Sequence, residues 1–222
     1  MKRSSKFMKR LLSVVLLVSF FSFVPNLETN PTKVVYARDV SNNRPYEWYM
    51  DQGDTGEFAG INCGPTSTAM ILKWLNRNSL VTGESLRNEI PANGNWWSTV
   101  IIQNYMNRNG IFYFTHRYNQ QTLVDAINAG RIALVCLNMS MIERNFNAES
   151  NIGRFYDNVT GHFIVVKGYK YIQNELYFEV YDPFSMGAEY ANGMRKGQDR
   201  LYKATEFGRA VTNWWNTIYT FR

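Results

Sequence analysis

The chain has a cysteine in a position where a thiol could act as a nucleophile. Cys63 stands directly before Gly-Pro in the stretch GINCGPTSTAMILKWLN, where apolar residues begin to recur at helical spacing. A thiol attacks a carbonyl as its thiolate, and both a helix N-terminus and a nearby imidazolium favour that form. The local sequence supplies the helix N-terminus, whereas an imidazolium has to come from the fold. From this stretch alone, Cys63 is a nucleophile, a small core residue or half of a disulfide.

A histidine and an aspartate at the two ends of one predicted β-hairpin could supply the base. The segment HFIVVKGYKYIQNELYFEVYDP reads as two strands, with His162 at its start and Asp182 near its end. A turn centred near Ile172 places these two residues opposite each other, with Cβ atoms about 4.5–5.5 Å apart. The carboxylate then holds one ring nitrogen, and the other nitrogen is free to exchange a proton with a nucleophile. A structural His–Asp pair at a strand end is the alternative, and a turn shifted by one residue would break the pairing.

The other cysteine and the other histidine have no such surroundings. Cys136 lies inside the apolar run RIALVCLNM, which favours core packing, and His116 lies near the end of the aromatic run IFYFTHRY, which favours a structural or rim position. The two cysteines and two histidines show no metal-ligand spacing. No glycine-rich phosphate loop or paired-carboxylate motif stands out. We therefore expect neither a metal ion nor another cofactor.

Helices predominate in the first half of the chain and strands in the second, which predicts an α+β fold with an antiparallel sheet. Cys63 would stand at the start of a helix over about 64–77, and Pro65 suits its first turn because the missing N–H costs nothing there. Further helices are predicted within 79–90 and 96–110, over 119–130 with Asn119 as the N-cap, and near 204–215. Strands are predicted at 111–118, at 131–139, in the two arms of the hairpin and at 217–222.

The first 37 residues have the pattern of a signal peptide. MKRSSKFMKR is basic, LLSVVLLVSFFSFV is apolar but shorter than the about 20 residues of a membrane span, and VYA ends at Ala37 with the small residues of a cleavage site. An uncleaved N-terminal anchor is the alternative. This segment holds six of the 24 Lys and Arg residues and one of the 18 Asp and Glu residues, so 38–222 is nearly neutral. We therefore expect a secreted protein with one domain at 38–222, and neither nucleic acid nor an anionic membrane surface as its partner.

Three short motifs, CGPTSTAMIL, GHFIVVKGY and YDP, resemble the bacteriocin-processing-like branch of the papain-like cysteine peptidases, family thirty-nine of the cysteine peptidases. The resemblance is to the free-standing, exported members. It implies a papain-like fold in which an N-terminal catalytic helix packs on an antiparallel sheet. It also implies Cys63, His162 and Asp182 as a triad and Gln52 as a donor to the oxyanion.

The resemblance implies that the protein is a thiol-dependent hydrolase that needs no cofactor, most simply a peptidase acting on a peptide or protein. No transporter domain follows these motifs, so cleavage of leader peptides after double glycine is not expected. The polar segment from Met141 to Gly161 is expected to be a long loop and one wall of the substrate cleft.

Three other interpretations remain open at this point. The same triad would serve an acyltransferase or an amidase acting on another amide. A papain-like scaffold without catalysis could bind a ligand through the aromatic side chains of Trp96, Trp97, Trp214 and Trp215. A disulfide between Cys63 and Cys136 would remove the nucleophile. The sequence indicates nothing about the oligomeric state.

Overall fold

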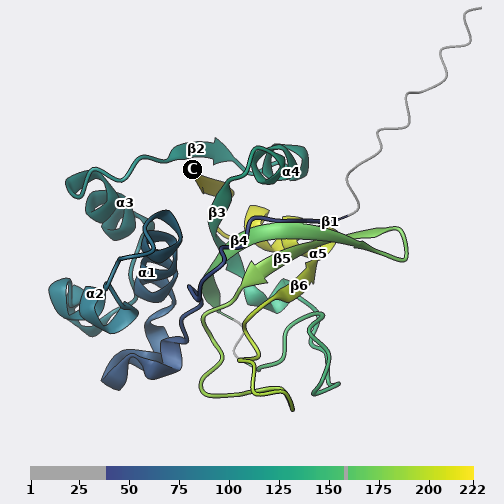
Figure 1. The fold of residues 1–222 in the computed structure, drawn as a ribbon, viewed down its shortest axis with the longest axis horizontal. Coiled ribbons are helices and arrows are strands. Elements are labelled where there is room, and N and C mark those ends of the chain that lie inside the picture. Colours follow the sequence, from purple (N-terminus) through teal and green to yellow (C-terminus); the bar gives the residue numbers. More distant parts are fainter. Residues whose placement is uncertain (1–38, 158–159) are drawn as a thin grey trace, which may run out of the picture. The chain divides into compact units, whose positions relative to one another are not determined.

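The computed structural model describes residues 39–157 and 160–222, and the predicted signal peptide at 1–37 lies outside this part. The described strands form one antiparallel sheet in the order β2-β7-β3-β4-β5-β6, and β1 also pairs with β4 (Figure 1). The strands are β1 (Asp39–Ser41), β2 (Phe114–Arg117), β3 (Ile132–Asn138), β4 (Gly161–Ile172), β5 (Glu175–Tyr181), β6 (Arg200–Lys203) and β7 (Thr217–Phe221).

The helices are α1 (Cys63–Leu75), α2 (Gly83–Glu89), α3 (Thr99–Arg108), α4 (Gln120–Asn128) and α5 (Ala204–Thr212). Short 3-10 turns occupy Gln52–Asp54, Gly56–Ile61, Ala92–Gly94 and Met139–Met141. The expected α+β fold with an antiparallel sheet is therefore confirmed. Within the described ranges, no helix has the length and apolar character needed to cross a membrane.

Local sequence signals account for the ends of these helices. The side chain of Asn119 caps α4 by accepting hydrogen bonds from the backbone N–H groups of Gln121 and Thr122, as expected of an N-cap. Thr82 and Ser85 form a reciprocal capping box at the start of α2. The helix α1 begins one residue earlier than predicted, at Cys63 itself.

Apolar side chains fill both faces of the sheet. Trp74 of α1 and Phe163 of β4 belong to the core on one face, where α1 and α3 pack. Ile127 of α4 and Phe207 of α5 belong to the core on the other face. The strand β3 lies between β7 and β4 and is buried along its length up to its last residue, which confirms the predicted central strand. Figure 1 shows α1, α2 and α3 gathered beside one another, next to β4.

The predicted register of the β4–β5 hairpin was wrong. Ile172 pairs with Glu175, so the turn consists of Gln173 and Asn174, both with positive φ, and is not centred on Ile172. A bulge between Val166 and Gly168 then shifts the pairing back by one residue, which does not restore the predicted register. The polar Gln-Asn pair between two apolar runs was the signal that would have placed the turn.

His162 and Asp182 are consequently not directly opposite each other. Beyond the bulge Val166 pairs with Val180, and His162 pairs across the other edge of β4 with Leu137 of β3. Asp182 follows the last residue of β5. Side chains alternate between the two faces along each strand, and His162 and Asp182 each lie an even number of residues from the paired Val166 and Val180. The two side chains are therefore on the same face of the sheet, as diagonal neighbours instead of direct partners.

Candidate active site

Cys63 is held at the mouth of α1 by close packing. It is the first residue of the helix and is only 2% exposed. The next residue, Gly64, lets this end of the helix approach Trp97, because a Cβ at position 64 would stand 2.8 Å from the Cβ of Trp97. The thiol therefore lies in a fixed place at the N-terminus of α1, the positive end of the helix dipole.

A buried hydrogen bond ties this helix to the strand that carries His162. The hydroxyl of Ser67, one turn after Cys63, donates to the backbone carbonyl of Phe163 at 3.1 Å. Phe163 directly follows His162. This bond fixes the first turn of α1 against the start of β4, and so sets the position of the thiol relative to the imidazole.

Asp182 holds the imidazole of His162 from one side. The Nε2 atom of His162 lies 2.7 Å from Oδ1 of Asp182, and the side chains are nearly or fully buried. Asp182 also accepts hydrogen bonds from the backbone N–H of Phe184 at 2.9 Å and from the hydroxyls of Tyr156 and Tyr202. Because Nε2 is engaged by the carboxylate, Nδ1 is the ring nitrogen left for Cys63, with which the ring also interacts.

This pair is charged near neutral pH. Burial alone would lower the pKa of His162, but the Asp182 carboxylate and the interaction with Cys63 outweigh it and raise the pKa to about 10. Burial alone would likewise raise the pKa of Asp182, yet the His162 charge and the hydrogen bonds from His162, Tyr202 and Phe184 hold it below its usual value. The site thus contains a buried imidazolium–carboxylate pair.

We expect this ion pair to make stability depend on pH between about 6.5 and 10. An unfolded histidine loses its proton near pH 6.5, whereas folded His162 keeps its proton up to about pH 10. Because the folded state binds more protons in this interval, the free energy of unfolding falls as pH rises. Urea denaturation at several pH values should show the wild type losing stability relative to the double variant His162→Gln/Asp182→Asn. A difference that stays constant with pH would contradict the ion pair.

Gln52 is fully buried between the loop that leads to Cys63 and the turn that follows Asp182. Its Nε2 atom donates to the carbonyl of Ala59 at 2.7 Å, and its backbone N–H donates to the carbonyl of Pro183 at 2.7 Å. One hydrogen of the amide is thus committed to Ala59, and the second remains for another acceptor. Its Oε1 atom has no hydrogen-bond partner among the residues that the structure describes.

A recess of about 180 Å³ lies beside Cys63, and four of the eight residues that line it are aromatic. Besides Cys63, the residues that line it are Trp96, Trp97, Cys136, Thr160, Gly161, Phe163 and Trp214. The ring of Trp214 lies against Gly161, since a Cβ at position 161 would stand 2.2 Å from it. Trp214 and Trp96 are 53% and 43% exposed, so the recess opens to solvent between large apolar surfaces.

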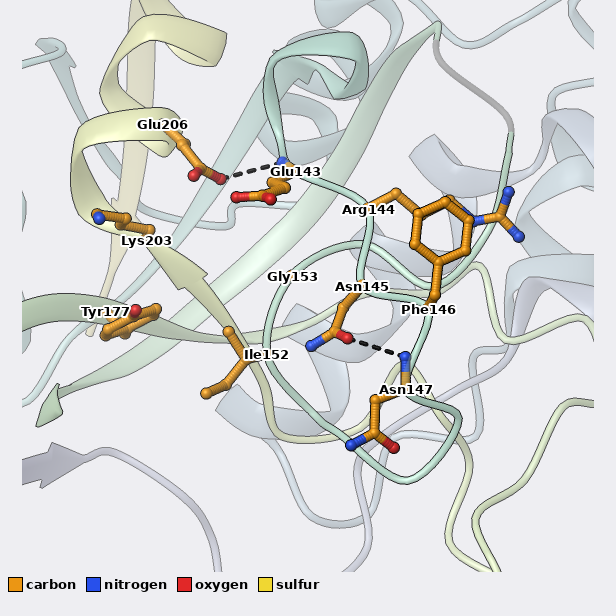
Figure 2. Close-up of a pocket in the computed structure, with 10 residues that line it drawn as sticks. All are labelled: Glu143, Arg144, Asn145, Phe146, Asn147, Ile152, Gly153, Tyr177, Lys203 and Glu206. Atoms are coloured by element: carbon orange, nitrogen blue, oxygen red, sulfur yellow. Dashed lines mark hydrogen bonds between the residues drawn. The ribbon is translucent and has the colours of Figure 1, made fainter.

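The long loop between β3 and β4 contributes little to this recess. Its last residue, Thr160, lines the recess, and Tyr156 reaches Asp182 with its hydroxyl. The parts of the loop at 143–147 and 152–153 line a larger hollow of about 460 Å³, where Phe146 and Asn147 stand across from Tyr177 and Lys203 (Figure 2). The residues that line this hollow do not include Cys63, His162 or Asp182, so the larger hollow is not the place of the chemistry.

The remaining thiol and imidazole lie as the sequence indicated. Cys136 is buried in β3, and burial strongly raises the pKa of its thiol. Both cysteines are free thiols, so the structure does not contain the Cys63–Cys136 disulfide that the sequence left open. His116 lies on the edge strand β2, beside Phe114. No group of three or more His, Cys, Asp or Glu side chains suited to a metal ion occurs in the described part of the chain.

A buried cysteine at the start of a helix, with a His–Asp pair on the antiparallel sheet against which that helix packs, defines a papain-like protein of the cysteine peptidase type. The chain belongs to the Peptidase_C39 like family, whose model matches residues 42–208. This range includes Gln52, Cys63, His162 and Asp182. Membership places the chain among the thiol-dependent, peptidase-like hydrolases.

Solved structures share this fold at low sequence identity. A protein assigned as a C39-like peptidase from Bacillus anthracis matches with a TM-score of 0.53 and 17% identity, over 83% of this chain and 98% of that one. The digestive procathepsin L 3 of the Tenebrio molitor larval midgut matches with a TM-score of 0.51 and 14% identity, over 86% of this chain and 72% of that one. No curated protein matches the chain in sequence. The expected papain-like fold is confirmed by these likenesses.

Proposed function

We propose that the chain is an exported peptidase that cleaves an amide bond through an acyl-enzyme on Cys63, with His162 and Asp182 completing a triad. One observation carries the proposal. Nε2 of His162 lies 2.7 Å from Oδ1 of Asp182, and the hydrogen bond from Ser67 to Phe163 holds the first turn of α1, which begins at Cys63, against the strand that carries this ring. The position of Cys63 at the N-terminus of α1 adds to this support.

In the proposed reaction the proton of the Cys63 thiol is on Nδ1 of His162 before the substrate is attacked, so the pair starts as a thiolate and an imidazolium. The thiolate adds to the amide carbonyl carbon, and the carbonyl electron pair moves to its oxygen. When that pair returns, the C–N bond breaks, the amine takes the proton from Nδ1, and a thioester to Cys63 remains. His162 then takes a proton from water, the hydroxide adds to the thioester, and the acid departs as Sγ leaves. Asp182 keeps the ring oriented through Nε2 in every step.

Gln52 is proposed to donate its second amide hydrogen to the developing oxyanion, together with the backbone N–H of Cys63. We expect Gln52→Ala to lower kcat by about 10²–10³-fold, because a lost oxyanion donor costs that much in comparable sites. Alkylation of Cys63 by iodoacetamide forms no oxyanion, so its rate should change by less than about threefold. Kinetics with a fluorogenic peptide and alkylation followed by mass spectrometry measure the two effects. An equal loss in both assays would indicate that Gln52 only supports the fold.

The substrate is proposed to be a peptide with a large apolar side chain beside the scissile bond. The support is the aromatic recess that adjoins Cys63 and opens between Trp96 and Trp214. Burying such a side chain in an apolar pocket stabilises the complex by about 1.5–3 kcal/mol relative to leaving it exposed. The recess contains no charged residue, which disfavours a charged side chain at this place.

Incubating the protein with a mixture of peptides in ¹⁸O-labelled water tests the proposal. We expect cleavage next to aromatic or large aliphatic residues, with one ¹⁸O atom in each new carboxylate. Transfer of the acyl group to an added amine, with little hydrolysis, would indicate an acyltransferase instead. Binding of peptides without turnover would indicate a binding module on a papain-like scaffold.

Export is part of the proposal and is supported by the sequence of residues 1–37, which lie outside the described part. A basic run followed by an apolar run of signal-peptide length, and then VYA, suits removal of this segment after Ala37. The domain that acts on the substrate is then 38–222. N-terminal sequencing of the secreted protein checks this, and an intact Met1 would support the anchor instead.

A further inference from the structure

An arginine is buried close to the nucleophile without a carboxylate partner. Arg87 of α2 is 2% exposed. Its Nε donates to Oδ1 of Asn62 at 2.6 Å, and its Nη1 donates to the carbonyls of Pro91 and Asn95 at 3.0 and 2.8 Å. Its Nη2 makes no hydrogen bond to any residue that the structure describes. The guanidinium is therefore held by neutral acceptors, and its charge is left without a countercharge in these contacts.

Arg87 is fixed relative to Cys63 through two routes. Asn62, its hydrogen-bond partner, is the residue directly before Cys63. In addition, α2 lies tightly against α1, because a Cβ at Gly83 would stand only 2.4 Å from Oγ1 of Thr66. The charge thus has a defined place beside the first turn of α1.

The same contacts continue to the proposed oxyanion donor. The Nδ2 atom of Asn62 donates to Oγ1 of Thr55 at 2.8 Å, and that hydroxyl donates to the backbone carbonyl of Gln52 at 2.5 Å. Arg87 therefore anchors a buried chain of hydrogen bonds that joins the peptide before Cys63 to Gln52. A shift of the guanidinium would therefore move both the Asn62–Cys63 peptide and Gln52.

Electrostatics single out Arg87 among the groups around the thiol. The charge of Cys63 acts on His162 from β4, on Cys136 from β3 and on Arg87 from α2. Burial lowers the pKa of Arg87, and a negative charge on Cys63 raises it. His162 exchanges its proton during the reaction and Cys136 stays a neutral thiol near pH 7. A guanidinium stays charged throughout, so it can favour the anionic form of Cys63 in every step.

We propose that Arg87 is a positioning residue that supports the thiolate of Cys63 with a permanent buried charge and aligns the Asn62–Cys63 peptide and Gln52 for the oxyanion. The inference rests on the proposed thiol chemistry and adds a residue to it. The guanidinium acts through the field and through Asn62, without touching the substrate.

The pH profile of Cys63 alkylation tests this role, because a merely structural arginine would not change its shape. We expect Arg87→Met to slow alkylation by iodoacetamide about tenfold at pH 6 and less than about twofold at pH 9.5, where hydroxide forms the thiolate without help. Arg87→Lys, which keeps the charge, should recover most of the rate at pH 6. The difference should persist in 1 M NaCl, since a buried charge is screened weakly.

Arg200→Met is the matched control. Arg200 is a fully buried guanidinium that donates to the carbonyls of Ser150 and Gly153 in the long loop and to the hydroxyl of Tyr190. Its loss should cost stability but leave the pH profile unchanged. If Arg87→Met does not fold, Arg87→Gln, which can still donate to Asn62, is compared with Arg87→Lys in its place.

The outcomes separate this inference from the proposed function. A wild type whose Cys63 reacts slowly at pH 6 would overturn the proposed thiol chemistry itself. A wild type that reacts fast, with neutral Arg87 variants showing the same profile, would overturn the role of Arg87 alone. Equal slowing by Arg87→Met and Arg87→Lys would show that shape matters and charge does not, which also overturns it.

Discussion

Replacing Cys63 by alanine should reduce peptide hydrolysis by at least about 10³-fold and leave the protein folded. Without the sulfur no acyl-enzyme can form, and an oxyanion site with bound substrate alone retains only a small part of the rate. The substitution removes one atom from the packed start of α1, where Cys63 is 2% exposed, so the fold loses little contact. Steady-state kinetics with a cleaved peptide and a thermal melting curve measure the two effects.

Thiol labelling supplies the control for this prediction. Iodoacetamide at about pH 6 should label Cys63 and not Cys136, because burial raises the pKa of Cys136 and keeps it as a thiol. The Cys63→Ala variant should therefore take up no label although Cys136 is still present. Hydrolysis that survives in Cys63→Ala, or label found on Cys136 first, would contradict the assignment of the nucleophile.

Replacing His162 by alanine is expected to lower hydrolysis by about 10²–10⁴-fold, the range for loss of a general base. The variant loses the imidazolium that stabilises the thiolate and the acid that protonates the leaving amine. It also leaves the fully buried carboxylate of Asp182 without its main partner, so some loss of stability accompanies the change. The pH dependence of alkylation separates these effects. The rate at pH 6 should collapse, whereas the rate above about pH 9.5 should largely recover because the thiolate then forms without an imidazolium.

The other histidine offers a matched control for this variant. His116 lies on the edge strand β2, opposite Ile218 of β7, and takes no part in the site described above. His116→Ala should keep both the hydrolytic rate and the alkylation profile of the wild type. If His116→Ala lost as much activity as His162→Ala, destabilisation of the fold would explain both results. That outcome would contradict the role of His162 as the base.

The hydrogen bonds to Asp182 fix its carboxylate and thereby the orientation of the His162 ring. Two tyrosine hydroxyls, one backbone N–H and the imidazole all donate to the Asp182 carboxylate. A carboxylate with four donors stays ionised and cannot rotate, so the ring that it holds stays in one orientation. One of these donors, Tyr156, comes from the long loop and links that loop to the site, although other parts of the loop line another hollow.

Local patterns in the sequence determined which residues could do chemistry and the elements that carry them. The helix that begins at Cys63, the central strand with Cys136 and the two strands with His162 and Asp182 at their ends were all predicted. Each rests on interactions between residues near in sequence: side-chain periodicity, caps and turn residues. The hairpin register was the local feature that failed, because the turn and the bulge at Val166/Gly168 each moved it.

Only the tertiary structure decided how these elements meet. The bond from Ser67 to Phe163, the two tyrosines on Asp182 and the contact of Arg87 with Asn62 join residues 20 to 96 positions apart in the chain. No periodicity or spacing records such contacts, since they depend on the packing of whole helices against the sheet. The sequence therefore indicated the candidates for nucleophile, base and carboxylate, and the packing of α1 and α2 decided their geometry and the burial of Arg87.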